Sequence, residues 1–156
     1  MKVLFVCRSN AERSQVAQLL FNKTSKKNNA NSAGLALVDF EKGLAPGRIM
    51  TELMLSQGYN DFTKQHRKQL TEEMANGSDK VIVIMTRGQI RALLPQFVKK
   101  SDKVVYWDKV KDPKNDKDRI TARNKIKKLV KTLVKNLDKK IKVYLFLQNI
   151  NIYIYK

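Results

Sequence analysis

Three short apolar runs stand out in the pattern of hydrophobic and polar positions. They are Lys2–Val6 (KVLFV), Lys80–Met85 (KVIVIM) and Lys103–Trp107 (KVVYW). Continuous apolar runs of this length are typical of strands buried on both faces of a parallel sheet. We therefore predict three buried strands, and the turn-rich stretch Asn28–Gly34 is a candidate for a fourth.

Apolar residues at helical spacing predict helices between and after these strands. The segments are Ser14–Asn22, Ile49–Leu55, Arg87–Val98 and Asp118–Leu137, with a further short helix at the end of Asp61–Met74. Gly58 fits a C-cap, and Pro95 should interrupt or end its helix. Strands that alternate with helices imply right-handed βαβ units. The pattern predicts one three-layer αβα domain around a mainly parallel, four-stranded sheet.

The end of the chain departs from this pattern. Ile141–Lys156 is strongly apolar, and its last part alternates from Ile150 to Tyr155. Alternation favours a strand, added to a sheet edge or paired with another chain. We therefore divide the chain into a domain of residues 1–138 and an extension of residues 139–156. The extension could support oligomers, or could be a non-native addition.

Composition narrows the class of protein. The 156 residues suit one domain with a real core, and 42% of them are hydrophobic, so the chain is not of a disordered type. The formal net charge is +18, which attracts anionic substrates and polyanions. Nucleic-acid binding is a secondary hypothesis only, because general enrichment in Lys, Asn and Ile accounts for part of that charge.

Cys7 is the single cysteine. No intramolecular disulfide can form, which fits a reducing compartment. Met1–Val6 is too short for the apolar part of a signal peptide, and no run of 18 apolar residues suggests a membrane span. We expect a cytoplasmic protein with no membrane partner.

The candidate chemistry lies in the polar loop after the first predicted strand. The loop has the pattern C-x5-R-S, and its residues are Cys7, Arg8, Ser9, Asn10, Ala11, Glu12, Arg13 and Ser14. A cysteine at a strand end that faces a helix N-terminus lies near unpaired N–H groups and the positive end of the helix dipole. These groups and the guanidinium of Arg13 favour the nucleophilic thiolate.

The same loop is suited to holding a phosphoryl group. Its N–H groups can form an anion nest, and the planar fork of Arg13 can bind two phosphoryl oxygens. Ser14 can donate its hydroxyl to the sulfur of Cys7. A buried structural cysteine is the alternative, but the strand before and the helix after the loop favour a phosphate site.

Four separated segments resemble the low-molecular-weight protein tyrosine phosphatases, which share their fold with thioredoxin-coupled arsenate reductases. The segments are LFVCRSNAERSQ, the SAG sequence Ser32–Gly34, VIVIMTRGQIRALLP (Val81–Pro95) and WDKVKDP (Trp107–Pro113). With the long amphipathic helix, the resemblance covers about residues 1–138. It implies hydrolysis of a phosphomonoester, most characteristically phosphotyrosine, through a cysteinyl-phosphate intermediate, with Cys7 and Arg13 in the site.

The resemblance also implies a general acid. By motif this is Asp112, because it alone among its neighbours Asp108, Asp116 and Asp118 precedes a proline. A carboxylic acid can protonate the leaving oxygen of a phosphate ester, and Pro113 restricts the backbone of Asp112. The implied partners are a phosphorylated protein or a small phosphate ester, with inorganic phosphate as product. We expect no cofactor and no metal, and the lone His66 fits a surface residue.

Two departures from the family's pattern bear on the site. Glu12 places a carboxylate in a phosphate loop, where it needs a cation, and Arg8, Lys42 and Arg48 are candidates. Lys114 and Asn115 follow Asp112–Pro113, where the family often has aromatic residues against the phosphotyrosine ring. Tyr106, Trp107 or Phe40 could supply that wall instead.

Two alternative functions remain. The thioredoxin-coupled reductases need two further cysteines, which this chain lacks, so that chemistry is excluded. A single-cysteine arsenate reductase that uses an external thiol stays open. A non-catalytic basic protein that binds anions or nucleic acid is the other alternative, and it would not need Cys7.

Overall fold

A four-stranded parallel sheet forms the centre of the protein, whose residues 1–154 are described by a computed structural model, with side chains up to residue 139. The strands are β1 (Lys2–Cys7), β2 (Asn29–Gly34), β3 (Lys80–Val83) and β4 (Val104–Tyr106). Their order is β2-β1-β3-β4, and every pair is parallel. The predicted sheet is therefore confirmed, with Asn29–Gly34 as its fourth strand.

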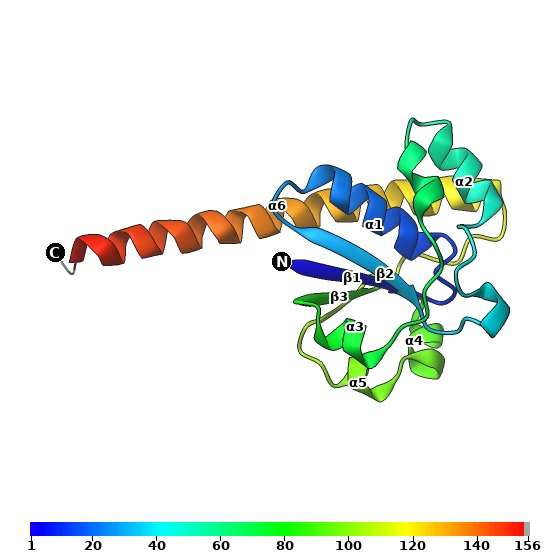
Figure 1. The fold of residues 1–156 in the computed structure, drawn as a ribbon, viewed down its shortest axis with the longest axis horizontal. Helices are drawn as coiled ribbons and strands as arrows, with labels where there is room; N and C mark the ends of the chain where they lie inside the picture. Colours follow the sequence, from blue (N-terminus) through cyan, green and yellow to red (C-terminus); the bar gives the residue numbers. More distant parts are fainter. Residues whose placement is uncertain (155–156) are drawn as a thin grey trace.

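Helices cover both faces of the sheet (Figure 1). One face carries α1 (Arg13–Thr24), α2 (Arg48–Leu55) and the long α6 (Asp116–Ile154), and the other carries α3 (Glu72–Asn76), α4 (Arg87–Leu93) and α5 (Gln96–Lys99). Two 3₁₀ turns, η1 (Asp39–Glu41) and η2 (Asn60–Lys64), lie in the connections. The three-layer αβα arrangement matches the prediction.

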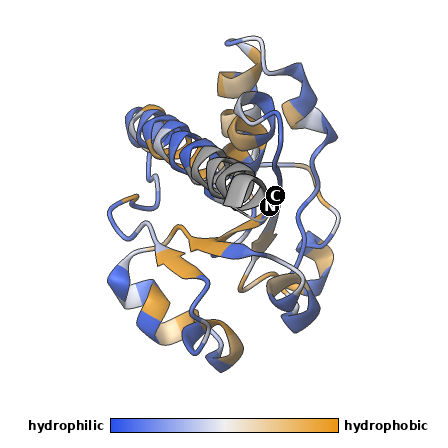
Figure 2. Ribbon diagram, turned by 90° about the vertical axis from the view of Figure 1, so that its left-hand side faces the viewer, coloured by the Kyte–Doolittle hydropathy of each residue, from blue (hydrophilic) through white to orange (hydrophobic). Residues whose placement is uncertain are grey.

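The two layers of core explain why the two central strands, β1 and β3, are almost continuously apolar. In β1, Val3 and Phe5 pack under α1 and α6, whereas Leu4 and Val6 pack under α3 to α5. Successive side chains of a strand point to opposite faces, so a central strand covered on both sides needs apolar residues at nearly every position. Figure 2 shows such hydrophobic stretches, in orange, on strands of the sheet.

The predicted breaks after two helices are observed, although Ser56, and not Gly58, is the C-cap of α2. Gly58 adopts a φ of 78° just after α2, a left-handed conformation that glycine reaches without a side-chain clash. Pro95 separates α4 from α5, where it lacks the N–H that a continuous helix would need.

The predicted C-terminal strand is wrong. Residues 141–154 continue α6, which runs as one helix of 39 residues from Asp116 and extends beyond the sheet (Figure 1). No glycine or proline follows Pro113, so nothing in the sequence stops the helix. The alternation at the end of the chain covers too few residues to compete with that propagation. Tyr155 and Lys156 lie outside the described residues.

The helix passes through the predicted boundary between residues 138 and 139, and the division of the chain there stays a prediction. Across the part of the chain that the structure describes, no helix is both long and apolar enough to cross a membrane.

Candidate active site

The predicted phosphate loop lies at the carboxyl end of β1, between Cys7 and the first residue of α1, Arg13. The carbonyl groups of Cys7, Arg8 and Ala11 accept hydrogen bonds from residues outside the loop. The N–H of Leu35 lies 3.0 Å from the oxygen of Cys7 and 2.8 Å from that of Arg8, which also accepts from Ala36 at 2.9 Å. The N–H groups of residues 8–12 donate to no described residue. A loop with bonded carbonyls and free N–H groups is suited to an anion.

Asn10 braces this loop from behind. It is fully buried and has a φ of 49°, the left-handed region in which asparagine is enriched. Its Nδ2 donates to Ser14 Oγ at 2.8 Å and to Ser32 Oγ at 2.9 Å, and its Oδ1 accepts the N–H of Lys68 at 2.8 Å. One amide therefore joins the loop to α1, β2 and the chain before α3.

Gly34 lets β2 approach the loop closely. A Cβ atom at this position would lie 2.8 Å from the nitrogen of Asn10 and 2.9 Å from the carbonyl carbon of Ser9. Real Cβ contacts with backbone are not that short, so only glycine fits. The Ser32–Gly34 segment thus supports the loop in two ways, through the hydroxyl at its start and the missing side chain at its end.

The sulfur of Cys7 has a hydroxyl partner. Ser14 Oγ lies 3.0 Å from Cys7 Sγ. Because Asn10 already donates to Ser14 Oγ, the hydroxyl hydrogen of Ser14 is free to point toward the sulfur. Such a donor stabilises a thiolate, which is the role predicted for Ser14.

The guanidinium of Arg13 is buried beside the loop. Its side chain is 4% exposed, and its Nη2 forms an ion pair with the carboxylate of Asp112. Its Nη1 is buried and has no hydrogen-bond partner among the described residues. A buried guanidinium nitrogen without an acceptor is costly unless an anion supplies one.

Asp112 lies over the loop from the connection between β4 and α6. Its Oδ1 meets Arg13, and its Oδ2 accepts a hydrogen bond from Gln89 Nε2. The carboxylate is about half-exposed, which leaves it in contact with solvent. It therefore has both a fixed position and access to water.

These groups share one small cavity of about 170 Å³. It is lined by Cys7, Ser9, Ala11, Glu12, Arg13, Asp112 and Pro113. Larger hollows lie elsewhere, but none of them contains Cys7, and size alone does not mark the reactive site. Asp108, Asp116 and Asp118 do not line the cavity, so Asp112 is the candidate acid that meets the loop.

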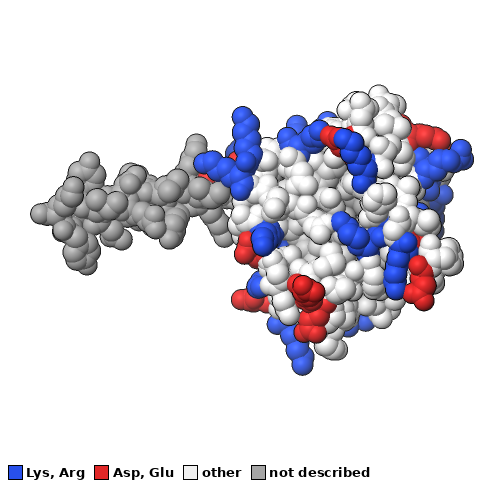
Figure 3. All heavy atoms as spheres, in the orientation of Figure 1, with Lys and Arg blue, Asp and Glu red and all other residues white. Residues whose placement is uncertain are grey.

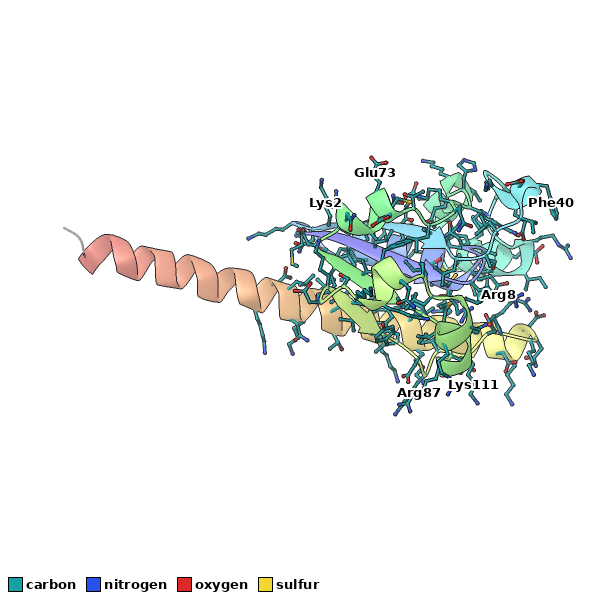
Figure 4. The ribbon with its side chains drawn as sticks, turned by 90° about the horizontal axis from the view of Figure 1, so that it is seen from below. Lys2, Arg8, Phe40, Glu73, Arg87 and Lys111 are labelled. Atoms are coloured by element: carbon teal, nitrogen blue, oxygen red, sulfur yellow. The ribbon has the colours of Figure 1, made fainter. Side chains whose placement is uncertain are left out.

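The other predicted loop residues divide into three groups. Ser9, Ala11 and Glu12 line the cavity, whereas Asn10 and Ser14 support it from behind. Arg8 is exposed and lies at the end of the molecule that also carries Phe40, opposite Lys2 and Glu73 (Figure 4).

The predicted partners of Glu12 are wrong. Its Oε1 accepts from Nε of Arg119 in α6 at 3.0 Å, and both side chains are mostly buried. Lys42 pairs with Asp39 and Arg48 with Glu52, each close in sequence. Arg119 is the partner of Glu12 because the first turn of α6 lies against the loop. The sequence alone does not reveal this contact.

Gln89 is a second residue that the sequence analysis did not identify. Its Oε1 accepts the N–H of Thr86 at 3.2 Å, the reciprocal half of a capping box at the start of α4. This leaves its Nε2 for Asp112. The T-x-x-Q pattern predicts the cap, but the contact with Asp112 depends on the fold.

The three aromatic candidates lie in different surroundings. Trp107 packs on Phe5 with ring centroids 5.6 Å apart, so it belongs to the core rather than to a substrate wall. Tyr106 and Phe40 are exposed, Phe40 by 79%. Near Tyr106, the hydrogen bond from Arg87 holds the pKa of Asp108 below its usual value. His66 is exposed, as predicted.

The fold and the loop define a class of protein: an α/β enzyme scaffold that places one cysteine, one buried arginine and one aspartate around an anion nest. The model of the low molecular weight phosphotyrosine protein phosphatase family matches residues 2–143, and the chain belongs to that family. No curated protein sequence is significantly similar to the chain.

Solved structures with the same fold include three of different activity. A low molecular weight protein tyrosine phosphatase from T. tengcongensis is 26% identical, with a TM-score of 0.75, over 87% of this chain and 99% of that one. An arginine phosphatase from Geobacillus stearothermophilus is 23% identical, with a TM-score of 0.75, over 89% and 94%. A thioredoxin-dependent arsenate reductase from Corynebacterium glutamicum is 23% identical, with a TM-score of 0.68, over 89% and 62%.

Proposed function

We propose that this phosphatase is a protein tyrosine phosphatase that works through a cysteinyl-phosphate intermediate. The observation that carries the proposal is the shared cavity of Cys7, Arg13 and Asp112. A nucleophile, a cation for phosphoryl oxygens and a proton donor are the three groups that this chemistry needs.

In the first step, the thiolate of Cys7 attacks phosphorus in line with the leaving oxygen. The S–P bond forms, the P–O bond breaks, and the carboxylic acid of Asp112 gives its proton to the leaving oxygen. The loop N–H groups and Arg13 stabilise the charge on the three equatorial oxygens throughout. Arg13 Nη1, which donates to none of the described residues, is available for one of them.

In the second step, water attacks the phosphocysteine. Asp112, now a carboxylate, accepts a proton from that water, and the S–P bond breaks to release inorganic phosphate and the thiolate. Ser14 Oγ, 3.0 Å from the sulfur, stabilises Cys7 as the leaving group. No step requires a metal or an organic cofactor.

For the substrate, the aryl ester of phosphotyrosine is the first choice. Arg8 of the phosphate loop lies at the end of the molecule that carries Phe40, an exposed aromatic side chain that is available to the ring of a phosphotyrosine (Figure 4). Phosphoarginine and small phosphate esters fit the same loop chemistry. Because an arginine phosphatase has the same fold, phosphoarginine is the alternative substrate to be tested beside phosphotyrosine.

Two alternative functions, arsenate reduction and nucleic-acid binding, lead to different expectations. A reductase that borrows an external thiol would release arsenite from arsenate, and the reductase of this fold is the reason to test it. A nucleic-acid binder would need a continuous basic surface. On the face shown in Figure 3, Lys and Arg are spread out, with Asp and Glu among them, which does not favour that function.

The experiment compares wild type with Cys7→Ser on an aryl phosphate, a phosphotyrosyl peptide and a phosphoarginyl peptide, with arsenate reduction in the presence of glutathione in parallel. We expect phosphate release by wild type only, fastest from phosphotyrosine. Turnover by Cys7→Ser would contradict the assignment of Cys7 as the nucleophile. Arsenite production without phosphate release would favour the reductase.

A further inference from the structure

The carboxylate of Glu12 has no role in the mechanism above, although it lines the same cavity as Cys7. It is held in place on two sides. Arg119 Nε donates to its Oε1 at 3.0 Å, and the side chains of the pair are 15% and 18% exposed. The backbone of Gly47 closes over it, since a Cβ there would lie 3.2 Å from Oε1. A shielded pair of this kind is screened by salt less than a surface pair.

Arg119 stands in the first turn of α6, directly after the connection that carries Asp112. That turn also fixes the residues that follow Pro113. The N–H of Asp118 donates to Asn115 Oδ1 at 2.9 Å, and the N–H of Lys114 donates to Asp118 Oδ2 at 3.2 Å. Wherever Arg119 is held, the backbone just after Asp112–Pro113 is held with it.

The phosphate loop thus binds the segment from Asp112 to Arg119 at two points. Glu12 binds Arg119, and the next residue, Arg13, binds Asp112. One attachment would leave the segment free to pivot, whereas two define both its distance and its angle over the loop. Figure 1 shows the start of α6 at the same end of the molecule as the loop after β1.

We propose that the Glu12–Arg119 ion pair is a positioning device that aims Asp112 at the leaving oxygen. This inference rests on the proposed function, because it assigns Glu12 and Arg119 to the orientation of its general acid. They are positioning residues and do not touch the reacting atoms. The pairing also neutralises Glu12, which would otherwise repel a phosphate dianion.

A positioning role and a merely structural role of the Glu12–Arg119 pair differ in one respect. Only for a positioning role does the loss of activity depend on the leaving group. A poor leaving group such as phenolate needs the acid, whereas dinitrophenolate leaves without a proton. A loop that has lost its shape binds anions less well and slows both substrates alike. A misaimed acid slows only the phenyl ester, so the ratio of kcat/KM values for the two esters is the readout.

The experiment uses Glu12→Gln and Arg119→Gln. In both variants, kcat/KM for phenyl phosphate should fall about tenfold relative to that for dinitrophenyl phosphate, the scale of a small displacement of a catalytic group. In Glu12→Gln, inorganic phosphate should inhibit as well as in wild type or better, because a negative charge is lost and Arg119 stays. In an Asp112→Asn background, Glu12→Gln should change the ratio no further.

The matched control is Glu41→Gln, which breaks the Glu41–Arg67 pair, 3.1 Å apart and similarly buried, away from the acid segment. Its ratio should equal that of wild type. An unchanged ratio in Glu12→Gln and Arg119→Gln would overturn the inference, as would an equal loss on both esters with weakened phosphate inhibition. If Asp112→Asn itself left the ratio unchanged, the acid assignment of the proposed function would fail first.

Discussion

The carboxylate of Asp112 is bound to the guanidinium of Arg13. A phosphoryl group therefore competes with Asp112 for one arm of the arginine fork. The contact also explains how a half-exposed side chain keeps a defined position above Cys7. It gives the candidate acid two distinct effects, one on catalysis and one on anion binding.

Replacing Asp112 with Asn should move these effects in opposite directions. Without the acid, kcat for phenyl phosphate should fall on the order of 100-fold, the usual scale of general acid catalysis. Inorganic phosphate should bind more tightly, because the competing carboxylate is gone. Steady-state kinetics with phosphate as inhibitor measures both. The control is Asp108→Asn, which changes a carboxylate of the same connection that binds Arg87 instead; a large loss there would move the acid role.

The brace formed by Asn10 should contribute to stability as well as to anion binding. Asn10→Ala leaves Ser14, Ser32 and the N–H of Lys68 without their buried partner. A buried polar group that loses its partner costs about 1–3 kcal/mol, so the free energy of unfolding should drop by about 1 kcal/mol or more. Urea unfolding measures it, with the exposed Asn136→Ala as control. Equal stability of the two variants would contradict the bracing role.

The close approach of Gly34 predicts a steric effect. A methyl group there meets the backbone of Asn10 and Ser9, so Gly34→Ala should destabilise the protein by roughly 2 kcal/mol or more and weaken phosphate binding. Gly88→Ala in α4 has open space around it and should be neutral or stabilising by up to about 1 kcal/mol. Thermal unfolding of the pair provides the comparison. If both variants were equally stable, the loop would tolerate the methyl group.

The local parts of the fold could be predicted from the sequence because their causes are local. Buried strands show as apolar runs, and the strand–loop–helix context of Cys7 and Arg13 is contiguous in the chain. The brace of Asn10 reaches Lys68, 58 residues away, and the partner of Glu12 is 107 residues away. Spacing along the chain carries no information on such contacts, and three nearer cations therefore seemed suitable for Glu12.

The C-terminal segment shows the opposite error, in which a local pattern was given too much weight. Alternation over six residues favours a strand only if a sheet edge is within reach. The preceding helix already sets the direction of the chain, and it continues without a glycine or proline to end it. The context of the segment, and not its own periodicity, decided its structure.

The most direct test of the central proposal is to trap the phosphorylated enzyme. Asp112→Asn lacks the group that activates water in the second step, so an activated aryl phosphate should load Cys7 faster than it is released. Mass spectrometry of the acid-quenched variant should show one added phosphoryl group, on the peptide that contains Cys7, and none in Cys7→Ser/Asp112→Asn. A phosphoryl group on another residue, or aryl phosphate turnover with the double variant, would contradict the cysteinyl-phosphate mechanism.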